Sequence, residues 1–172
     1  VVPATDLSPR RPRSIYGASK VAAELYLSIV ELETGLSIAS LRPGNIYGPW
    51  QDPHGEAGVV AIFIERMLRG DDVTVFAPGT DTRDYVYVDY IVEAFIRAST
   101  ADGSADCLVG TGIETSTLEI FQTLARLTGY TRDPIMGPPR PGDIRRVGLD
   151  SSRALRAWGW RPEVSLEEGL RR

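Results

Sequence analysis

The segment SIYGASK, residues 14–20, opens the longest stretch of helical periodicity in the chain. Apolar residues such as Leu25 recur at mostly three- and four-residue intervals, and Gly35 follows as a stop signal. Residues 36–41 then form a short apolar run that is typical of a buried strand. We therefore expect a helix over residues 14–34 that leads directly into a strand.

Strand and helix signals alternate along most of the remaining chain. Residues 42–58 are rich in proline and glycine and predict a long loop after the first strand, and the chain is again loop-rich from 134 to 143. The local patterns predict strands at 73–76, 85–88 and 107–109 and helices at 59–68, 90–99, 116–127, 152–158 and 166–172. This alternation indicates an α/β layered fold.

Composition narrows the class of protein. The 172 residues carry a formal net charge of −4 without acidic or basic runs, which argues against a nucleic-acid-binding surface. The single cysteine, Cys107, cannot form an internal disulfide, and no apolar stretch reaches the length of a membrane helix, so we expect a soluble cytoplasmic protein. Because the chain begins at Val1 with a proline-rich loop, we expect it to be the later part of a longer protein.

Tyr16 and Lys20 lie four residues apart near the start of the first predicted helix, so their side chains share one face. A nearby ammonium favours the phenolate, which would allow a tyrosine to act as a general base nearer neutral pH. The same spacing also fits a solvated helix edge. The surrounding residues decide between these interpretations.

Tyr16 and Lys20, in the context SIYGASK and preceded by Thr5-Asp6, resemble the motif of the extended short-chain dehydrogenase/reductase family. The resemblance implies the C-terminal portion of an extended Rossmann fold, with late Rossmann elements and a small substrate-binding domain interleaved over residues 1–172. It also implies an NAD cofactor, Tyr16 as the acid/base, and Lys20 on the nicotinamide ribose. Pro43 is implied as a further cofactor contact.

Two further motifs contain candidate substrate ligands. LRPGNIYGP, residues 41–49, follows a strand end and holds Asn45, and GTDTRDYVYVD, residues 79–89, holds Arg83. A guanidinium suits bidentate binding of phosphate oxygens. The resemblance implies that both residues contact a nucleotide-sugar diphosphate, although an asparagine turn and a salt bridge to a neighbouring aspartate are the alternatives.

The resemblance implies four more substrate-binding residues: Val60, Phe76, Arg140 and Asp143. The last two stand in RPGD, residues 140–143, where a turn without a ligand is nearly as good an interpretation. The string QDPHGEAGVV, residues 51–60, closely resembles the corresponding segment of bacterial and archaeal UDP-glucose 4-epimerases.

Three other features are interpreted as structural. His54, the only histidine, has no second ligand at metal spacing, so no metal site is expected. Gly110-Thr111-Gly112 lacks the spacing of a dinucleotide loop and predicts a turn. Trp158 and Trp160 are expected in the core.

These observations predict part of an NAD-dependent epimerase that inverts C4 of a UDP-sugar through a 4-keto intermediate. A 4,6-dehydratase or uronate epimerase on the same scaffold is the nearest alternative, and a non-catalytic nucleotide-sugar-binding fragment is an alternative of another class. The glycine-rich phosphate loop is not found in the sequence. We therefore expect the isolated chain to be inactive, to bind NAD weakly and to expose apolar surface, and the longer protein to be a homodimer.

Overall fold

Helix α1 (Ile15–Thr34) leads into strand β1 (Ala39–Pro43) in the computed structural model, which describes residues 2–54, 58–139 and 144–172. The Ser14 hydroxyl caps the helix by accepting from the Gly17 amide, and Gly35 ends it in a left-handed conformation with φ of 70°. This confirms the expected helix-to-strand unit.

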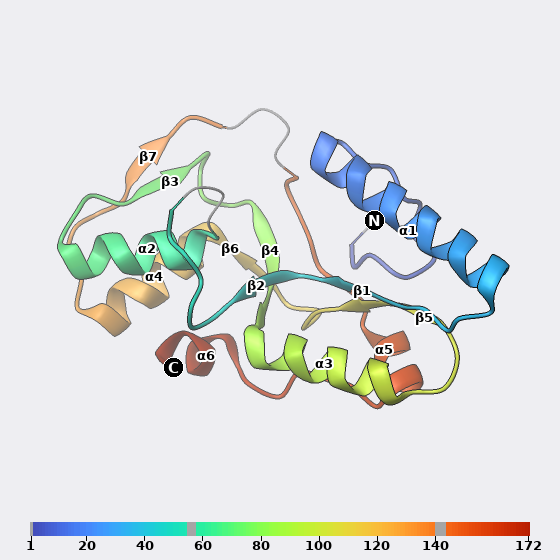
Figure 1. Ribbon diagram of the computed structural model, residues 1–172. Helices are drawn as coiled ribbons and strands as arrows, with labels where there is room; N and C mark the ends of the chain where they lie inside the picture. Colours follow the sequence, from blue (N-terminus) through green and yellow to red (C-terminus); the bar gives the residue numbers. More distant parts are fainter. Residues whose placement is uncertain (1, 55–57, 140–143) are drawn as a thin grey trace.

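Strand β1 pairs in parallel with β5 (Ala105–Val109), and Leu41 stands opposite Cys107. Helix α1 lies on one side of this strand pair, and α3 (Val88–Thr100) and α5 (Ser152–Trp158) lie on the other (Figure 1).

The remaining strands form two small sheets. The first places β4 between a parallel partner, β2, and an antiparallel partner, β6, and the second pairs β3 with β7 in parallel. Helices α2 and α4 pack against each other beside them, and α6 closes the chain near β4 (Figure 1). Their bounds are β2 (Asn45–Tyr47), α2 (Val59–Arg69), β3 (Thr74–Phe76), β4 (Thr82–Tyr87), β6 (Glu114–Ser116), α4 (Thr117–Thr128), β7 (Ile135–Gly137) and α6 (Leu166–Arg171).

Three of these strands correct the sequence-based prediction. β2 interrupts the loop expected over residues 42–58, β7 interrupts the loop expected after 134, and β6 was not expected at all. Each has only three residues, too few to show a periodic pattern, and each is defined by hydrogen bonds to a strand far away in the sequence.

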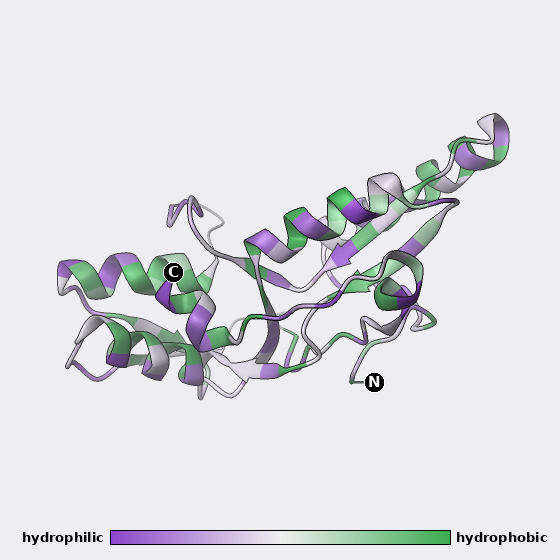
Figure 2. Ribbon diagram, turned by 90° about the horizontal axis from the view of Figure 1, so that it is seen from below, coloured by the Kyte–Doolittle hydropathy of each residue, from purple (hydrophilic) through white to green (hydrophobic). Residues whose placement is uncertain are grey.

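The buried side chains form two clusters. One lies around α2 and α4 and includes the edge-to-face pair Phe63 and Phe121, whose ring centroids are 6.1 Å apart. The other lies between the β1–β5 pair and helices α3 and α5 and includes Trp158 and Trp160, as expected. Figure 2 shows hydrophobic and hydrophilic residues alternating around the helices, the pattern of helices that bury one face.

Helix α1 differs from the other long helices because it has no buried residue. Its apolar side chains include Ile15, Tyr26 and Leu32, which are 91%, 76% and 81% exposed. The described structure therefore exposes a large apolar surface along this helix, as the sequence predicted. Among the described residues, no helix combines the length and apolarity that crossing a membrane requires.

Candidate functional site

Tyr16 lies in the first turn of α1, and Lys20 follows one turn later on the same face. The Lys20 ammonium is 5.2 Å from the centroid of the Tyr16 ring. The Tyr16 side chain is 68% exposed, so its phenol is open to a ligand. The structure thus brings together the two residues that the sequence predicted as a pair.

A cavity of about 270 Å³ is formed where strands β2, β3 and β4 meet helix α2. Three predicted substrate ligands, Asn45, Phe76 and Arg83, line this cavity although they come from three different strands. Parallel pairing of β2 with β4 places Asn45 opposite Tyr85, two residues from Arg83. The fold therefore concentrates an amide, an aromatic ring and a cation in one hollow.

The Arg83 guanidinium is held in place by backbone carbonyls. Its Nη1 donates to Thr82 O at 2.9 Å and to Ile144 O at 2.5 Å. A guanidinium has five N–H donors, and these two contacts use only one of its nitrogen atoms. Arg83 is thus oriented in the cavity and retains donors that suit an anionic oxygen.

Sequence reasoning missed several residues of this cavity, among them Asp81, Tyr85 and Thr117. Burial is the largest influence on the Tyr85 phenol and raises its pKa to about 12, so it remains neutral at ordinary pH. Because alternate residues of a strand share one face, Tyr85 could have been inferred from its position two residues after Arg83. Thr117 belongs to the start of α4, and the sequence holds no signal that links it to β4.

Residues 2–110, which contain Tyr16, Lys20, Asn45 and Arg83, match the NAD dependent epimerase/dehydratase family. This stretch is more than half of the chain. The chain belongs to the NAD dependent epimerase/dehydratase family.

Relatives within the epimerase/dehydratase family include nucleotide-sugar 4-epimerases. A UDP-glucose 4-epimerase from Mycolicibacterium smegmatis is 48% identical over 169 residues, which are 98% of this chain and 54% of that protein. A dTDP-L-rhamnose 4-epimerase from Burkholderia thailandensis is 33% identical and is matched over 96% of this chain and 46% of its own length. The chain thus spans about half the length of the curated relatives it matches.

Solved structures of the epimerase/dehydratase family have the same architecture. A Thermotoga maritima UDP-glucose 4-epimerase with UDP-glucose is 46% identical and superposes with a TM-score of 0.97 over 99% of this chain and 55% of its own. A Thermus thermophilus UDP-glucose 4-epimerase in complex with NAD is 45% identical, with a TM-score of 0.90 over 98% of this chain and 55% of its own. The described fold is therefore a portion of an extended Rossmann enzyme of this family.

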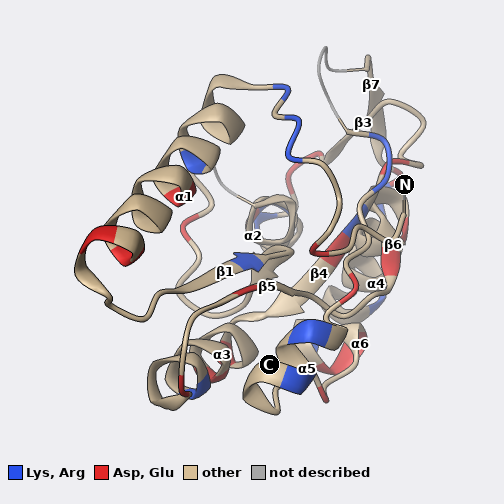
Figure 3. Cartoon of the chain, turned by 90° about the vertical axis from the view of Figure 1, so that its right-hand side faces the viewer, with Lys and Arg blue, Asp and Glu red and all other residues tan. Residues whose placement is uncertain are grey.

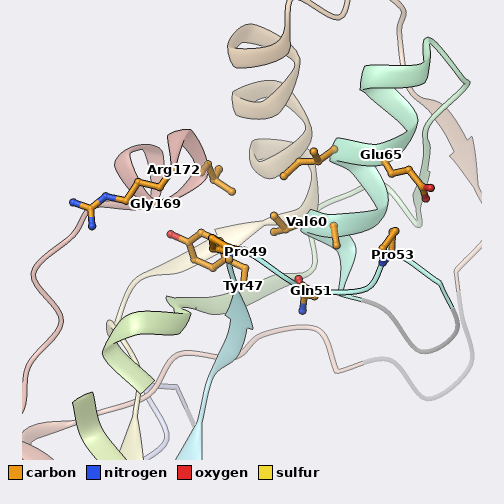
Figure 4. Close-up of a pocket in the computed structure, with 12 residues that line it drawn as sticks. Tyr47, Pro49, Gln51, Pro53, Val60, Glu65, Gly169 and Arg172 are labelled. Carbon is orange, nitrogen blue, oxygen red and sulfur yellow. The ribbon is translucent and has the colours of Figure 1, made fainter. Parts of the chain in front are cut away.

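The structure does not bring every predicted epimerase/dehydratase site residue to the cavity. Val60 is 4% exposed and lines a second cavity of about 360 Å³ beside Tyr47 (Figure 4), whereas its neighbour Val59 lines the first. Helix α2 turns the face that carries Val59 and Ile62 toward the first cavity and the face that carries Val60 and Ile64 toward the second. Pro43 ends β1 and is exposed, and Arg140 and Asp143 lie outside the described residues.

No cluster of metal-binding side chains is present in the described part of this family member. The His54 side chain is 71% exposed and lies 3.8 Å from the Glu65 carboxylate.

Proposed function

We propose that this chain is the later part of an NAD-dependent nucleotide-sugar 4-epimerase that interconverts sugars of the UDP-glucose and UDP-galactose type through a 4-keto intermediate. The observation that carries the proposal is the presence of an exposed Tyr16–Lys20 pair in a fold that also gathers Asn45, Phe76 and Arg83 around one cavity. The similarity to UDP-glucose 4-epimerases supports the proposed substrate class.

The cavity is assigned to the nucleotide diphosphate. Arg83 provides fixed N–H donors and Asn45 an amide for the phosphate oxygens, and the Phe76 ring provides an apolar surface for the base. Arg140 and Asp143 are assigned to the diphosphate and the ribose hydroxyls. Binding energy from these contacts would hold the 4-keto sugar in place while it turns.

Tyr16 is assigned as the acid/base. Its phenolate accepts the proton of the sugar C4 hydroxyl as C4 is oxidised, and its phenol returns a proton when C4 is reduced from the opposite face. Lys20, whose ammonium lies 5.2 Å from the centroid of the Tyr16 ring, is assigned to the ribose of the cofactor. NAD, when bound, supplies the two-electron oxidation and reduction.

The described residues fit one end of NAD. An exposed phenol and an ammonium on the same helix face suit a nicotinamide riboside, with Pro43 as a further contact. The glycine-rich phosphate loop belongs, by resemblance, to the half of the relatives that this chain does not span. The chain alone is therefore expected to bind NAD weakly and to be inactive, and calorimetric titration with micromolar NAD binding would contradict this.

The experiment that tests the function uses the longer protein that contains this chain, supplied with NAD and UDP-galactose. Formation of UDP-glucose is expected, and Tyr16→Phe should lower kcat by at least about 10²-fold because the proton acceptor is lost. Tyr26→Phe is the matched control, since Tyr26 is 76% exposed on the same helix and should keep full activity. Near-normal turnover of Tyr16→Phe would refute the assignment.

The same assay separates the alternatives. A structure of UDP-glucuronic acid 4-epimerase from Bacillus cereus is 27% identical with a TM-score of 0.88, so a uronate epimerase is the second candidate. Turnover of UDP-glucuronic acid but not UDP-galactose would favour it, and release of water from the sugar would indicate a 4,6-dehydratase. Nucleotide binding without turnover would indicate a non-catalytic protein.

We further propose that the longer protein is a cytoplasmic homodimer. The exposed apolar side chains of α1 support a homodimer of the longer protein, and sedimentation analysis would test it. The lone buried Cys107 is compatible with a reducing, cytoplasmic location.

A further inference from the structure

Four charged side chains join α1 to the strand pair beside it. Figure 3 shows acidic and basic positions along α1, β1 and β5, which lie next to one another. Arg42 on β1 donates from Nε to Glu24 Oε1 on α1 at 2.6 Å, and from Nη2 to Asp106 Oδ2 on β5 at 3.0 Å. Arg10 donates from Nη2 to the same Asp106 oxygen at 2.9 Å, and its Nε lies 3.1 Å from Glu24 Oε2. Two cations thus alternate with two carboxylates in a closed ring, which we call the α1 clamp.

The clamp is the main connection between α1 and the strands. No residue of α1 is buried, and in the described chain no other helix or strand packs closely along it. The side chains of Glu24 and Arg42 are only 17% and 21% exposed, whereas those of the surface pair Arg132 and Asp72 are 57% and 60% exposed. A network with partly desolvated members holds its geometry more firmly than an isolated surface pair.

The position of Glu24 on the helix gives the clamp a functional consequence. Tyr16, Lys20 and Glu24 are spaced four residues apart and lie along one helix face. A contact at Glu24 therefore fixes the rotation of α1 about its own axis. A helix turns by about 100° per residue, so even a partial rotation would redirect the phenol and the ammonium.

The partner of Glu24 connects this face to the cavity. Arg42 precedes the end of β1 by one residue, and the chain then passes through Gly44 to Asn45 at the start of β2. The Gly44 amide donates to Val109 O at 2.9 Å, which fixes this passage to β5. The clamp thus fixes the position of Tyr16 and Lys20 relative to β2, the strand that begins at Asn45.

We propose that Glu24 and Arg42 are positioning residues of the epimerase reaction, which orient α1 so that Tyr16 and Lys20 face the sugar held in the cavity. The inference rests on the proposed function. Neither residue needs to touch the substrate or the cofactor, so each acts through the orientation of the helix.

Hydrogen–deuterium exchange of the longer protein tests the clamp without relying on activity. In Glu24→Gln, the amides of α1 should exchange at least about tenfold faster, while the β5 amides keep their protection and show that the fold is intact. Glu33→Gln is the matched control, because Glu33 is an exposed residue of the same helix and should leave exchange unchanged. Unchanged α1 exchange in Glu24→Gln would overturn the proposal.

A second variant removes the other carboxylate of the clamp without altering the helix. Asp106→Asn leaves the sequence and intrinsic helicity of α1 intact, and it should also accelerate exchange in α1 by severalfold because both arginines lose a charged partner. Protection of α1 at the wild-type level in Asp106→Asn would count against the clamp.

Steady-state kinetics test the positioning role. Glu24→Gln should lower kcat for UDP-galactose by about tenfold and leave KM within about twofold, because the diphosphate ligands of the cavity are untouched. Faster α1 exchange together with a wild-type kcat would overturn the positioning role. If the wild-type protein shows no epimerase activity, the proposed function fails, and the exchange experiments still decide whether the clamp orients α1.

Discussion

Asp84 Oδ1 accepts hydrogen bonds from both the amide and the hydroxyl of Thr111, each at 2.7 Å. Its second oxygen accepts from the Gly112 and Leu149 amides at 2.9 and 3.1 Å, and the side chain is fully buried. A single carboxylate therefore joins β4 to the turn that follows β5 and to the segment that leads into α5. The residue before it, Arg83, lines the candidate substrate cavity, so this joint also stabilises the site.

We expect Asp84→Asn to lower the free energy of unfolding by about 3 kcal/mol. The amide would direct N–H donors at backbone N–H groups that the carboxylate now satisfies, and it would leave them without acceptors. Denaturant unfolding measures the change. Asp102→Asn in an exposed loop is the control and should stay within about 0.5 kcal/mol of the wild type, and equal stability of both variants would contradict the role of Asp84.

Gly44→Ala should destabilise the protein by about 2 kcal/mol. A methyl group on Gly44 would lie 2.5 Å from the Asp84 carbonyl oxygen. The backbone of β4 cannot easily move away, because β4 is hydrogen-bonded to β2 and β6. Thermal unfolding provides the measurement. Gly17→Ala should have a much smaller effect, because the nearest atoms would be 3.3 Å away; equal losses in both variants would show that the close approach at Gly44 is unimportant.

Arg83→Lys in the longer protein should weaken UDP binding by about tenfold or more. A lysine keeps the positive charge but loses the planar fork that both contacts the carbonyls of Thr82 and Ile144 and offers further donors to phosphate. Isothermal titration calorimetry with UDP tests this. Arg132→Lys, at a surface ion pair with Asp72, should bind UDP as the wild type does, and an unaltered Kd for Arg83→Lys would remove Arg83 from the substrate site.

Glu114 should make stability depend on pH between about 4.5 and 2. Hydrogen bonds from Arg146 and then from the Thr82 hydroxyl lower the pKa of its carboxyl from 4.5 to about 2. A depressed carboxyl pKa stabilises the folded state above the unfolded pKa, and this contribution is lost as pH falls through the folded value. The stability difference between wild type and Glu114→Gln should therefore be largest above pH 4.5 and shrink toward pH 2, and a difference that stays constant across this range would contradict the prediction.

Local sequence patterns predicted the long elements and their ends. Gly35, which was expected to stop the first helix, is a C-cap in left-handed conformation, and Gly70 and Gly129 end α2 and α4 in the same way, because glycine reaches that region without a steric penalty. The four-residue spacing of Tyr16 and Lys20 was sufficient to place both side chains on one face, since helix geometry is local.

The three-residue strands and the shape of the site could not be predicted in this way. β6 forms because residues Glu114–Ser116 pair with β4, about 30 residues earlier in the chain. No local sequence pattern predicts a partner at that distance. Asp81 and Thr117 reach the cavity from different elements, and Val59 rather than Val60 faces it because of the rotation of α2.

The sequence by itself determined the family, the α/β alternation and the placement of Tyr16 and Lys20 on one helix face, because these depend on residue type and on spacing within one element. Only the tertiary structure decided that Asn45, Phe76 and Arg83 share a cavity and that Arg10 and Arg42 join Glu24 to Asp106. Such groupings bring together side chains separated by up to 96 residues. These groupings depend on how the helices pack against the strands, because this packing sets the distances between side chains that lie far apart in the sequence.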